Sequence, residues 1–306
     1  MSGVSDAPFR RLAWRFGAGL VVSEMVASEA LATGDAEMRL KAAAAGLPVH
    51  AVQLAGREAR WMRLAARIAE DGGADLIDIN MGCPAKRVTT GYSGAALMRD
   101  LDHALRLIEA VVDEVDLPVT LKMRLGWDRD SINAPQLAAR AEQAGVRMVT
   151  VHARTRCQFY EGSADWAAVR AVREAIDIPL VVNGDIAGRQ GAERALRLAG
   201  ADAVMVGRAS YGAPWLAGAI AGASPAGIDI AAVVAAHFED MLGHYGVFAG
   251  LRQARKHLGW YFDRHGPGGQ ATLRGQLMTA TEPAHVLRLI AIAFPAGTTT
   301  ERRAAA

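Results

Sequence analysis

The chain has 306 residues, of which 51% are hydrophobic and 22% are charged, and its formal net charge at pH 7 is +2. This composition is ordinary for a globular protein and excludes a largely disordered chain. No apolar run approaches the roughly 18 residues that a membrane helix needs, and the N-terminus has no pattern of a secretory signal. Two cysteines, Cys83 and Cys157, are too few for a disulfide framework. We therefore expect a cytoplasmic protein with free thiols and no membrane partner.

Seven short apolar runs recur along the first two thirds of the chain, and most are followed by a helical stretch. They lie at residues 20–23, 49–54, 76–80, 119–123, 148–152, 180–183 and 203–206. The helical stretches lie at residues 57–71, 101–115, 135–144, 167–175 and 190–199. Runs without polar alternation are typical of strands that are buried on both faces of a parallel sheet. The repeat predicts an α/β fold, and the absence of a G-x-G-x-x-G motif favours a TIM (β/α)8 barrel over an open dinucleotide-binding sheet.

An eight-stranded barrel needs one strand more than the seven that can be counted. The chain begins at a loop-like segment, residues 1–8, so we expect the first strand to lie upstream of this chain. A linker containing proline and glycine follows at 221–227, and candidate helices lie beyond it at 231–245, 251–264 and 284–293. These features predict a barrel domain at 1–222, a small C-terminal all-helical domain at 228–295 and a frayed tail at 296–306.

Polar side chains follow almost every predicted strand, at the barrel face where active sites of TIM barrels lie. The strand-end segments are Ser23-Glu24-Met25, Gln53, Asn80 to Cys83, Lys122, His152 to Arg154, Asn183-Gly184-Asp185 and Gly207-Arg208. A barrel that serves only as a scaffold would not need them, so we expect an active site at this face. The loops after the last two strands are typical of a phosphate site, to which an arginine adds a direct contact.

Cys83 lies in the most distinctive segment, Asn80-Met81-Gly82-Cys83-Pro84. The glycine lets the chain turn and the proline stiffens it, which would hold the thiol over the barrel mouth. The alternative is a small buried hydrophobic residue. The next loop, residues 85–94, is basic and contains glycine, as in a loop that gates substrate. Lys122 ends an apolar strand, where a lysine is costly unless it is paired or faces a ligand, whereas His152 is equally consistent with a hydrogen-bonded core histidine.

A basic segment in the predicted helical domain is a second candidate site. Arg252, Arg255 and Lys256 are spaced to lie close together on one helix, and Trp260 and Tyr261 follow them. Basic residues beside aromatic ones suit contact with RNA, although a solvated basic face beside an aromatic core edge fits equally well. No metal-binding pattern of cysteine and histidine and no nucleophile elbow occurs, so we expect neither a metal site nor a serine-hydrolase site.

These motifs together resemble the tRNA-dihydrouridine synthases, specifically their bacterial B-type branch. The resemblance runs from Met1 to about Phe294 and is carried by Ser23 to Met25, Val52 to Gly56, Asp78 to Lys86, Val119 to Lys122, His152 to Arg156, Asn183 to Ile186, Gly207-Arg208, Ala254 to His257 and Trp260-Tyr261. It implies an FMN-binding barrel and a helical domain that binds tRNA. The FMN contacts that it implies are Met1, Gln53, Lys122, His152, Asn183, Gly184, Asp185, Gly207 and Arg208. Of the family's first FMN-binding segment, an Ala-Pro-Met turn, this chain has only Met1.

The resemblance also implies a mechanism in which the C5–C6 double bond of a uridine is reduced. NADPH reduces FMN, which passes a hydride to C6, and Cys83 acts as the acid that protonates C5 from the opposite side. Asn80 and Arg154 are implied to lie near the flavin or the base. A uracil stacked in folded tRNA must first be extruded. The B-type resemblance implies a uridine of the D-loop, and we expect the protein to be a monomer.

Two alternatives from other classes stay open on the sequence. An FMN barrel reductase of a small molecule, such as a dihydroorotate dehydrogenase, also carries a cysteine near a strand end, but it would not need a basic helical domain. The second alternative is a non-enzymatic RNA-binding or regulatory protein whose barrel has lost its catalytic activity. Such a protein would not need to retain Cys83, Lys122 and His152 together.

Overall fold

The computed structural model describes residues 1–223, 227–295 and 297–300. The chain forms two compact units, of which the first comprises Met1–Asp6 and Leu20–Gly207. The second comprises Ala7–Gly19 and the chain from Arg208 onward. This structural division differs from the predicted boundary at residue 222, because a segment near the N-terminus and the stretch after the last strand both belong to the second unit. The assignment of a cofactor domain and a tRNA domain to these regions stays a prediction.

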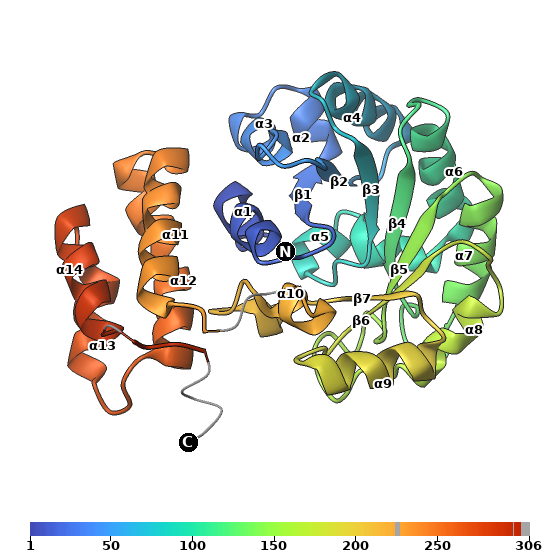
Figure 1. Cartoon of the computed structure of the whole chain (residues 1–306). Coiled ribbons are helices and arrows are strands. Elements are labelled where there is room, and N and C mark those ends of the chain that lie inside the picture. Colours follow the sequence, from blue (N-terminus) through green and yellow to red (C-terminus); the bar gives the residue numbers. More distant parts are fainter. Residues whose placement is uncertain (224–226, 296, 301–306) are drawn as a thin grey trace. The chain divides into compact units, whose positions relative to one another are not determined.

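The first unit contains one sheet of seven parallel strands in the order β1 to β7 (Figure 1). The strands are β1 (Val22–Ala27), β2 (Ala51–Ala55), β3 (Leu76–Met81), β4 (Val119–Arg124), β5 (Met148–His152), β6 (Leu180–Asn183) and β7 (Ala203–Met205). Each strand pairs in parallel with its neighbours in sequence, which is the topology of a TIM barrel. The predicted parallel β/α barrel is confirmed in these strands.

Burial explains why the strands read as apolar runs. Every residue of β2 and β6 is buried, and β3 to β5 each have a single partly exposed residue. β7, at one edge of the described sheet, is more exposed. β1, at the other edge, begins two residues later than predicted and runs to Ala27. Ser23, Glu24 and Met25 therefore lie within this strand and not at its end, which corrects their predicted position.

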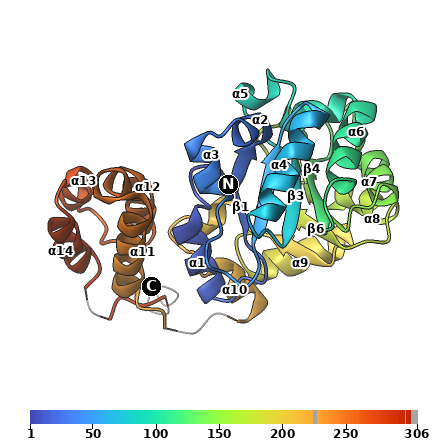
Figure 2. The same ribbon diagram turned by 90° about the horizontal axis from the view of Figure 1, so that it is seen from above.

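Helices cover the outside of the sheet (Figure 2). They are α2 (Ser28–Ala32), α3 (Ala36–Ala42), α4 (Ala59–Asp71), α5 (Lys86–Thr89), α6 (Leu101–Val112), α7 (Ala134–Gln143), α8 (Arg170–Arg173) and α9 (Arg189–Ala199), with 3-10 helices at Gly94–Arg99 and Ala167–Val169. In the outer layer, α4 packs on α6, α6 on α7, α7 on α8 and α8 on α9, while α5 contacts the 3-10 helix at Gly94–Arg99. Asp100 caps α6 by accepting a 2.9 Å bond from the His103 amide, and Gly200 ends α9 with a left-handed φ of 65°.

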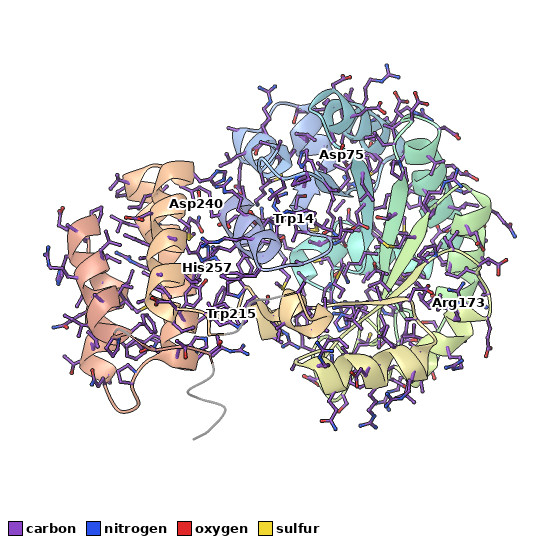
Figure 3. The ribbon with its side chains drawn as sticks, in the orientation of Figure 1. Trp14, Asp75, Arg173, Trp215, Asp240 and His257 are labelled. Atoms are coloured by element: carbon purple, nitrogen blue, oxygen red, sulfur yellow. The ribbon has the colours of Figure 1, made fainter. Side chains whose placement is uncertain are left out.

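The second unit is helical throughout its described residues. Its helices are α1 (Ala7–Arg15), α10 (Leu216–Ala221), α11 (Ile230–Tyr245), α12 (Val247–His265), α13 (Ala271–Thr279) and α14 (Pro283–Ala293), with a 3-10 helix at Arg208–Ser210. α1 packs on α10 and α11. Its Arg11 pairs at 2.6 Å with Asp240 of α11, which is labelled in Figure 3. The segment predicted as a loop, residues 1–8, therefore contains the start of a helix.

The end of the chain is described only in part. Of the predicted frayed tail, residues 297–300 are described, and Thr299 forms a bridge with Asp229 just before α11. Residues 296 and 301–306 lie outside the described residues, as do 224–226 of the predicted linker. No helix among the described residues is long and apolar enough to cross a membrane.

Candidate active site

A chain of buried polar side chains connects β2, β3 and β4. The Gln53 amide donates to Asp78 Oδ2 at 2.7 Å, and the Thr120 hydroxyl donates to Asp78 Oδ1 at 2.6 Å. The Asn80 amide donates in turn to Gln53 Oε1 at 2.8 Å. Strand register explains these contacts, because Gln53, Asp78 and Thr120 are direct neighbours across the sheet. The network fixes the orientation of the predicted site residues Gln53 and Asn80.

Cys83 lies on a turn that Asn80 holds in place. Asn80 Oδ1 accepts hydrogen bonds from the amides of Gly82 and Cys83 at 3.1 and 3.0 Å. The Cys83 carbonyl accepts a bond from the Ala95 amide at 3.0 Å. Gly94, with a φ of 58°, is needed beside this turn because a Cβ there would lie 2.8 Å from the Cys83 carbonyl oxygen. The thiol is partly exposed, so it is not the fully buried hydrophobic residue of the alternative interpretation.

Lys122 is a partly buried cation with one hydrogen bond among the described residues. Its Nζ donates to Asn183 Oδ1 at 3.3 Å, a long bond for an ammonium group. Burial lowers the pKa of Lys122 to about 8, helped by the charge of Arg124 and opposed by Asp78 and Cys83. An ammonium carries three N–H donors, so further donors are available to an electron-rich ligand.

Met1, Asn183 and Gly207 come together near the ends of the last two strands. A Cβ added to Gly207 would lie 4.0 Å from both Asn183 Nδ2 and Met1 Sδ. The Asn183 amide donates to the Met205 carbonyl at 2.8 Å, which orients its oxygen toward the ammonium on β4. Arg208 belongs to the second unit, so its predicted phosphate contact stays a prediction.

Arg154 and Asp185 form a bidentate ion pair in which the arginine is buried and the Asp185 side chain is 35% exposed. Arg154 Nη1 and Nη2 donate to the two Asp185 oxygens at 3.0 and 2.6 Å, and the arginine side chain is only 2% exposed. The guanidinium also donates to the carbonyls of Glu161 and Gly162, and Asp185 Oδ2 accepts a bond from the Ala164 amide. Because these groups are engaged within the protein, we interpret the pair as positioning two loops. A direct contact of either residue with a ligand stays a prediction.

His152 is buried beside the same ion pair. Its Nε2 lies 3.4 Å from Arg154 Nη1. Gly184 lies close to the imidazole ring, and a Cβ added to this glycine would lie only 2.9 Å from His152 Cδ2. Gly184 has a φ of 116°, and its carbonyl accepts a bond from Trp166 Nε1 at 2.8 Å. A side chain at Gly184 would therefore be strained and would also displace the imidazole.

Two side chains belong to this site although they were not predicted. Asp78 anchors the buried network, and burial raises its pKa, while the bonds from Thr120 and Gln53 lower it. Arg124 is 1% exposed and donates to the carbonyls of Gly82 and Phe159 at 2.9 and 2.8 Å. The signal in the sequence was a charged residue inside an apolar run, which needs a partner when it is buried.

The basic residues of the second unit lie on α12. Arg252 is exposed, with its guanidinium carbon 5.8 Å from the ring centre of Phe248. Lys256 Nζ donates to Gln253 Oε1 at 2.7 Å, and Arg255 Nε is buried without a hydrogen-bond partner among the described residues. The spacing thus places these cations on one helix, as predicted from the sequence.

The aromatic residues of this segment have internal partners. Trp260 stacks on Tyr211 with ring centres 4.0 Å apart. Tyr261 is 2% exposed, and its hydroxyl lies 3.1 Å from His237 Nδ1. The interpretation of Tyr261 as the edge of an aromatic core is therefore correct.

Comparisons with known proteins find relatives that match almost the whole chain. The family model described as dihydrouridine synthase matches residues 1–296. A probable tRNA-dihydrouridine synthase of Rhizobium leguminosarum bv. phaseoli is 58% identical over all of this chain and 96% of its own length. A probable tRNA-dihydrouridine synthase of Rhodobacter capsulatus is 57% identical over 96% of this chain and 93% of its own length. The tRNA-dihydrouridine synthase B of Xanthomonas campestris pv. campestris is 46% identical over 87% of this chain and 82% of its own length.

A solved structure shows the same fold in a distant protein. The 6-hydroxypseudooxynicotine amine oxidase of Pseudomonas geniculata aligns with a TM-score of 0.52 at 14% identity. The alignment covers 71% of this chain and 44% of that enzyme, and at this identity it supports the barrel architecture alone. From the match of the family model along almost the whole chain, we conclude that this chain belongs to the dihydrouridine synthase family.

Proposed function

We propose that this protein reduces a D-loop uridine of tRNA to 5,6-dihydrouridine, using FMN and NADPH. The observation that carries the proposal is the connection among Gln53, Asn80 and Cys83. The Asn80 side chain bonds both the Gln53 side chain and the backbone amide of Cys83. On the neighbouring strand, Lys122 is the register partner of Asn80. A thiol, an amide and an ammonium thus share one end of the barrel, which is where enzymes of this fold act.

The residues at this end fit the chemistry of a flavin. The ammonium of Lys122 makes one long hydrogen bond among the described residues, so it can donate to an electron-rich heteroaromatic ring. The side-chain amide of Gln53 suits a ring whose edge alternates hydrogen-bond donors and acceptors. We propose that FMN is bound by Met1, Gln53, Lys122, His152, Asn183, Gly184, Asp185, Gly207 and Arg208. When bound and reduced by NADPH, FMN supplies the hydride for C6 of the uracil.

The protein's own residues then supply position and a proton. Cys83 donates the thiol proton to C5, because it is partly exposed on a turn that Asn80 holds. Lys122 stabilises negative charge that develops beside it, since a cation that is partly shielded from water acts more strongly than one in solution. Arg154 is proposed to act near the base, and its ion pair with Asp185 keeps the adjoining loops in place.

The tRNA is proposed to bind the second unit through Arg252, Arg255 and Lys256. Cations on one helix attract the phosphate backbone without reading sequence. The uridine leaves its stack before it reacts, as enzymes acting on bases require. We place the protein in the cytoplasm as a monomer that needs no metal ion.

The test is a deletion of the gene followed by mapping of dihydrouridine in purified tRNA by mass spectrometry. We expect the loss of one or more D-loop dihydrouridines and their return on complementation. Unchanged dihydrouridine content would overturn the proposal. The purified full chain is expected to be yellow and to bleach on addition of NADPH, whereas a colourless protein would contradict the cofactor assignment.

A further inference from the structure

Two exposed aromatic residues near Cys83 have an unfavourable backbone conformation. Among the described residues, the non-glycine residues with left-handed φ are Tyr92 at 56°, Phe159 at 53° and Asp185 at 55°. All three follow the carboxyl ends of strands, after β3, β5 and β6 respectively. Asp185 has an evident reason, because both of its oxygens bind Arg154. Among the described residues, Tyr92 and Phe159 have no comparable hydrogen-bond partner that would explain this conformation.

The packing of the chain does not explain why these two residues are exposed and have a left-handed backbone conformation. Tyr92 is 68% exposed and Phe159 is 40% exposed, so each leaves a large apolar surface in water. A left-handed φ is unfavourable for a bulky side chain and is typical of positions constrained by a functional site. Among the described residues, the Tyr92 ring has no aromatic neighbour, and the aromatic neighbour of Phe159 is Tyr160, edge-on, with ring centres 4.8 Å apart. Both residues therefore keep ring surface that is accessible and that is not stacked on another ring of the described chain.

Hydrogen bonds tie both loops to the turn that carries Cys83. On the Tyr92 side, the Ala95 amide bonds the Cys83 carbonyl. On the other side, Arg124 donates to both the Gly82 and the Phe159 carbonyls. The rings therefore belong to loops that border the reactive thiol.

Cations near the rings favour a polyanionic partner. Lys86 and Arg87 lie on α5, a few residues before Tyr92 in the chain, and Arg87 is exposed. Arg156 precedes Phe159 and connects the two loops by donating to Thr89 of α5 at 3.3 Å. Aromatic rings interleaved with cations are the usual surface for unstacked bases of RNA, because every base has a face that can stack.

We propose that Tyr92 and Phe159 stack on RNA bases that flank the uridine entering beside Cys83. This inference rests on the proposed function. It adds residues that stabilise the tRNA in the state in which the uridine has left its stack. The rings take the place of the stacking partners that the neighbouring bases lose, which favours the extruded state.

The test compares Phe159→Ala and Tyr92→Ala with wild type in binding an unmodified tRNA transcript, measured with the full FMN-loaded chain. Removal of one stacking contact is expected to weaken binding about tenfold. The loss is expected to be equal at every salt concentration, because stacking releases no counterions, whereas Arg252→Ala should reduce the salt dependence. Leu64→Ala is the matched control, because Leu64 is also 40% exposed and lies on the outer helix α4.

Two further variants separate stacking from backbone strain. Phe159→Trp keeps an aromatic face and is expected to bind tRNA as tightly as wild type. Tyr92→Gly relieves the left-handed φ and is expected to melt no lower than Tyr92→Ala while binding tRNA equally weakly. Normal binding by Phe159→Ala and Tyr92→Ala would overturn the inference.

Failure of the inference is distinguishable from failure of the proposed function. If wild type forms dihydrouridine and the two alanine variants bind and react normally, only the stacking role is wrong. If wild type forms none, the proposed function itself fails. Light scattering gives the molar mass of each variant in solution. If a variant reacts normally but its molar mass differs from that of wild type, the rings make contacts between copies of this chain, and the inference is overturned.

Discussion

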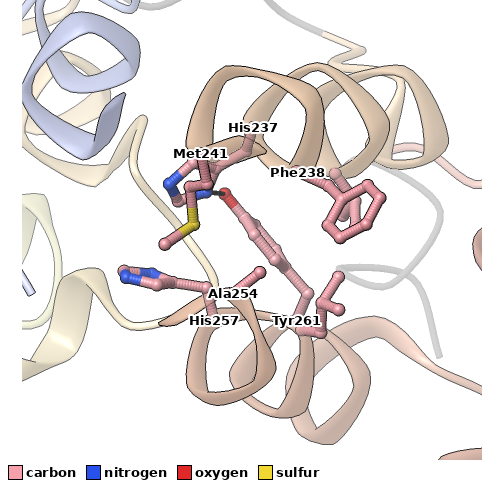
Figure 4. A pocket seen from close by; sticks show the side chains of 8 residues that line it. His237, Phe238, Met241, Ala254, His257 and Tyr261 are labelled. Carbon is pink, nitrogen blue, oxygen red and sulfur yellow. Dashed lines mark hydrogen bonds between the residues drawn. The ribbon is translucent and has the colours of Figure 1, made fainter. Parts of the chain in front are cut away.

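The barrel end of the first unit and the core of the second unit both bury titratable side chains, with different consequences. At the barrel end, Lys122 keeps unused N–H donors beside a partly exposed thiol. In the helical unit, His237 and His257 are 1% and 3% exposed, and their rings meet edge-to-face with centres 4.7 Å apart (Figure 4). Burial lowers the pKa of His237 to about 4 and that of His257 well below its ordinary value.

This difference concerns the condition under which a shifted pKa is evidence that a residue binds a ligand or takes part in a reaction. The two histidines contact apolar and aromatic side chains of the helical unit, including Phe238, Met241 and Tyr261, and nothing about their burial by itself indicates a reaction. Lys122 is held beside other polar groups at the open end of a barrel, where a ligand can approach. A displaced pKa therefore identifies a functional site only when the group can also be reached. The following predictions test this contrast, from the largest expected effect to the smallest.

Cys83→Ala is expected to reduce dihydrouridine formation by about 10²- to 10⁴-fold, because it removes the proposed proton donor. Flavin reduction by NADPH and tRNA binding should persist, because the backbone amide of Cys83 and its bond to Asn80 are retained. The measurement is dihydrouridine per tRNA by mass spectrometry. The exposed Cys157 supplies the control, since Cys157→Ala should react normally. Wild-type rates in Cys83→Ala would exclude the thiol as the acid.

Arg154→Met is expected to lower the free energy of unfolding by about 3 kcal/mol, because it removes the hydrogen bonds that the buried guanidinium donates to Asp185 and to two loop carbonyls. Urea denaturation measures the change. Arg274→Met in the helical unit is the matched control, because Arg274 and Asp263 form a bidentate pair that is about half exposed. The control should lose less than about 1 kcal/mol. Equal losses in the two variants would contradict a special role for burial at the barrel end.

Acid is expected to destabilise the helical unit through His237. Its folded pKa of about 4 lies below the ordinary value of 6.5, so the unfolded chain takes up the proton first. The stabilising contribution is present above pH 6.5 and is lost as the pH falls toward 4, by about 2 kcal/mol between pH 7 and pH 5. Burial causes the low value, while Asp240 opposes it and Arg11 and Lys256 add to it.

Urea denaturation at the two pH values, followed by circular dichroism, measures this loss. His237→Phe should show a smaller loss than wild type, whereas the same change at the partly exposed His103 should leave the pH dependence unaltered. An identical pH dependence in His237→Phe and wild type would show that this histidine is already charged in the folded protein.

Lys122 is expected to make FMN affinity depend on pH. Its pKa of about 8 means that the ammonium is charged at pH 7 and mostly neutral at pH 9. Affinity should fall about tenfold across this range if the charge contributes about 1.4 kcal/mol to binding. Fluorescence titration of FMN measures it. Lys122→Met should bind weakly and show no such dependence; a parallel pH profile in this variant would assign the titration to another group.

Local patterns determined much of this protein. The apolar runs predicted all seven described strands, and the polar residues after them predicted Gln53, Asn80, Cys83 and Lys122 as neighbours. This worked because parallel strands bring their carboxyl ends to one edge, so position along each strand is enough to bring distant residues together. Hydrophobic periodicity likewise predicted α11, α12 and α14 within a few residues of their ends.

Tertiary structure alone decided the remaining features. The sequence does not show that Asp78 joins Gln53 to Thr120, or that Arg124 reaches the carbonyls of two separate loops, because these contacts depend on register and side-chain direction across strands. It also does not show that α1 belongs to the helical unit, because the apolar face of a short helix does not specify its partner. The sequence by itself determined which residues form strands and which polar groups end them. Packing decided which of these groups are buried, paired or left for a ligand, because that balance depends on neighbours far away in the chain.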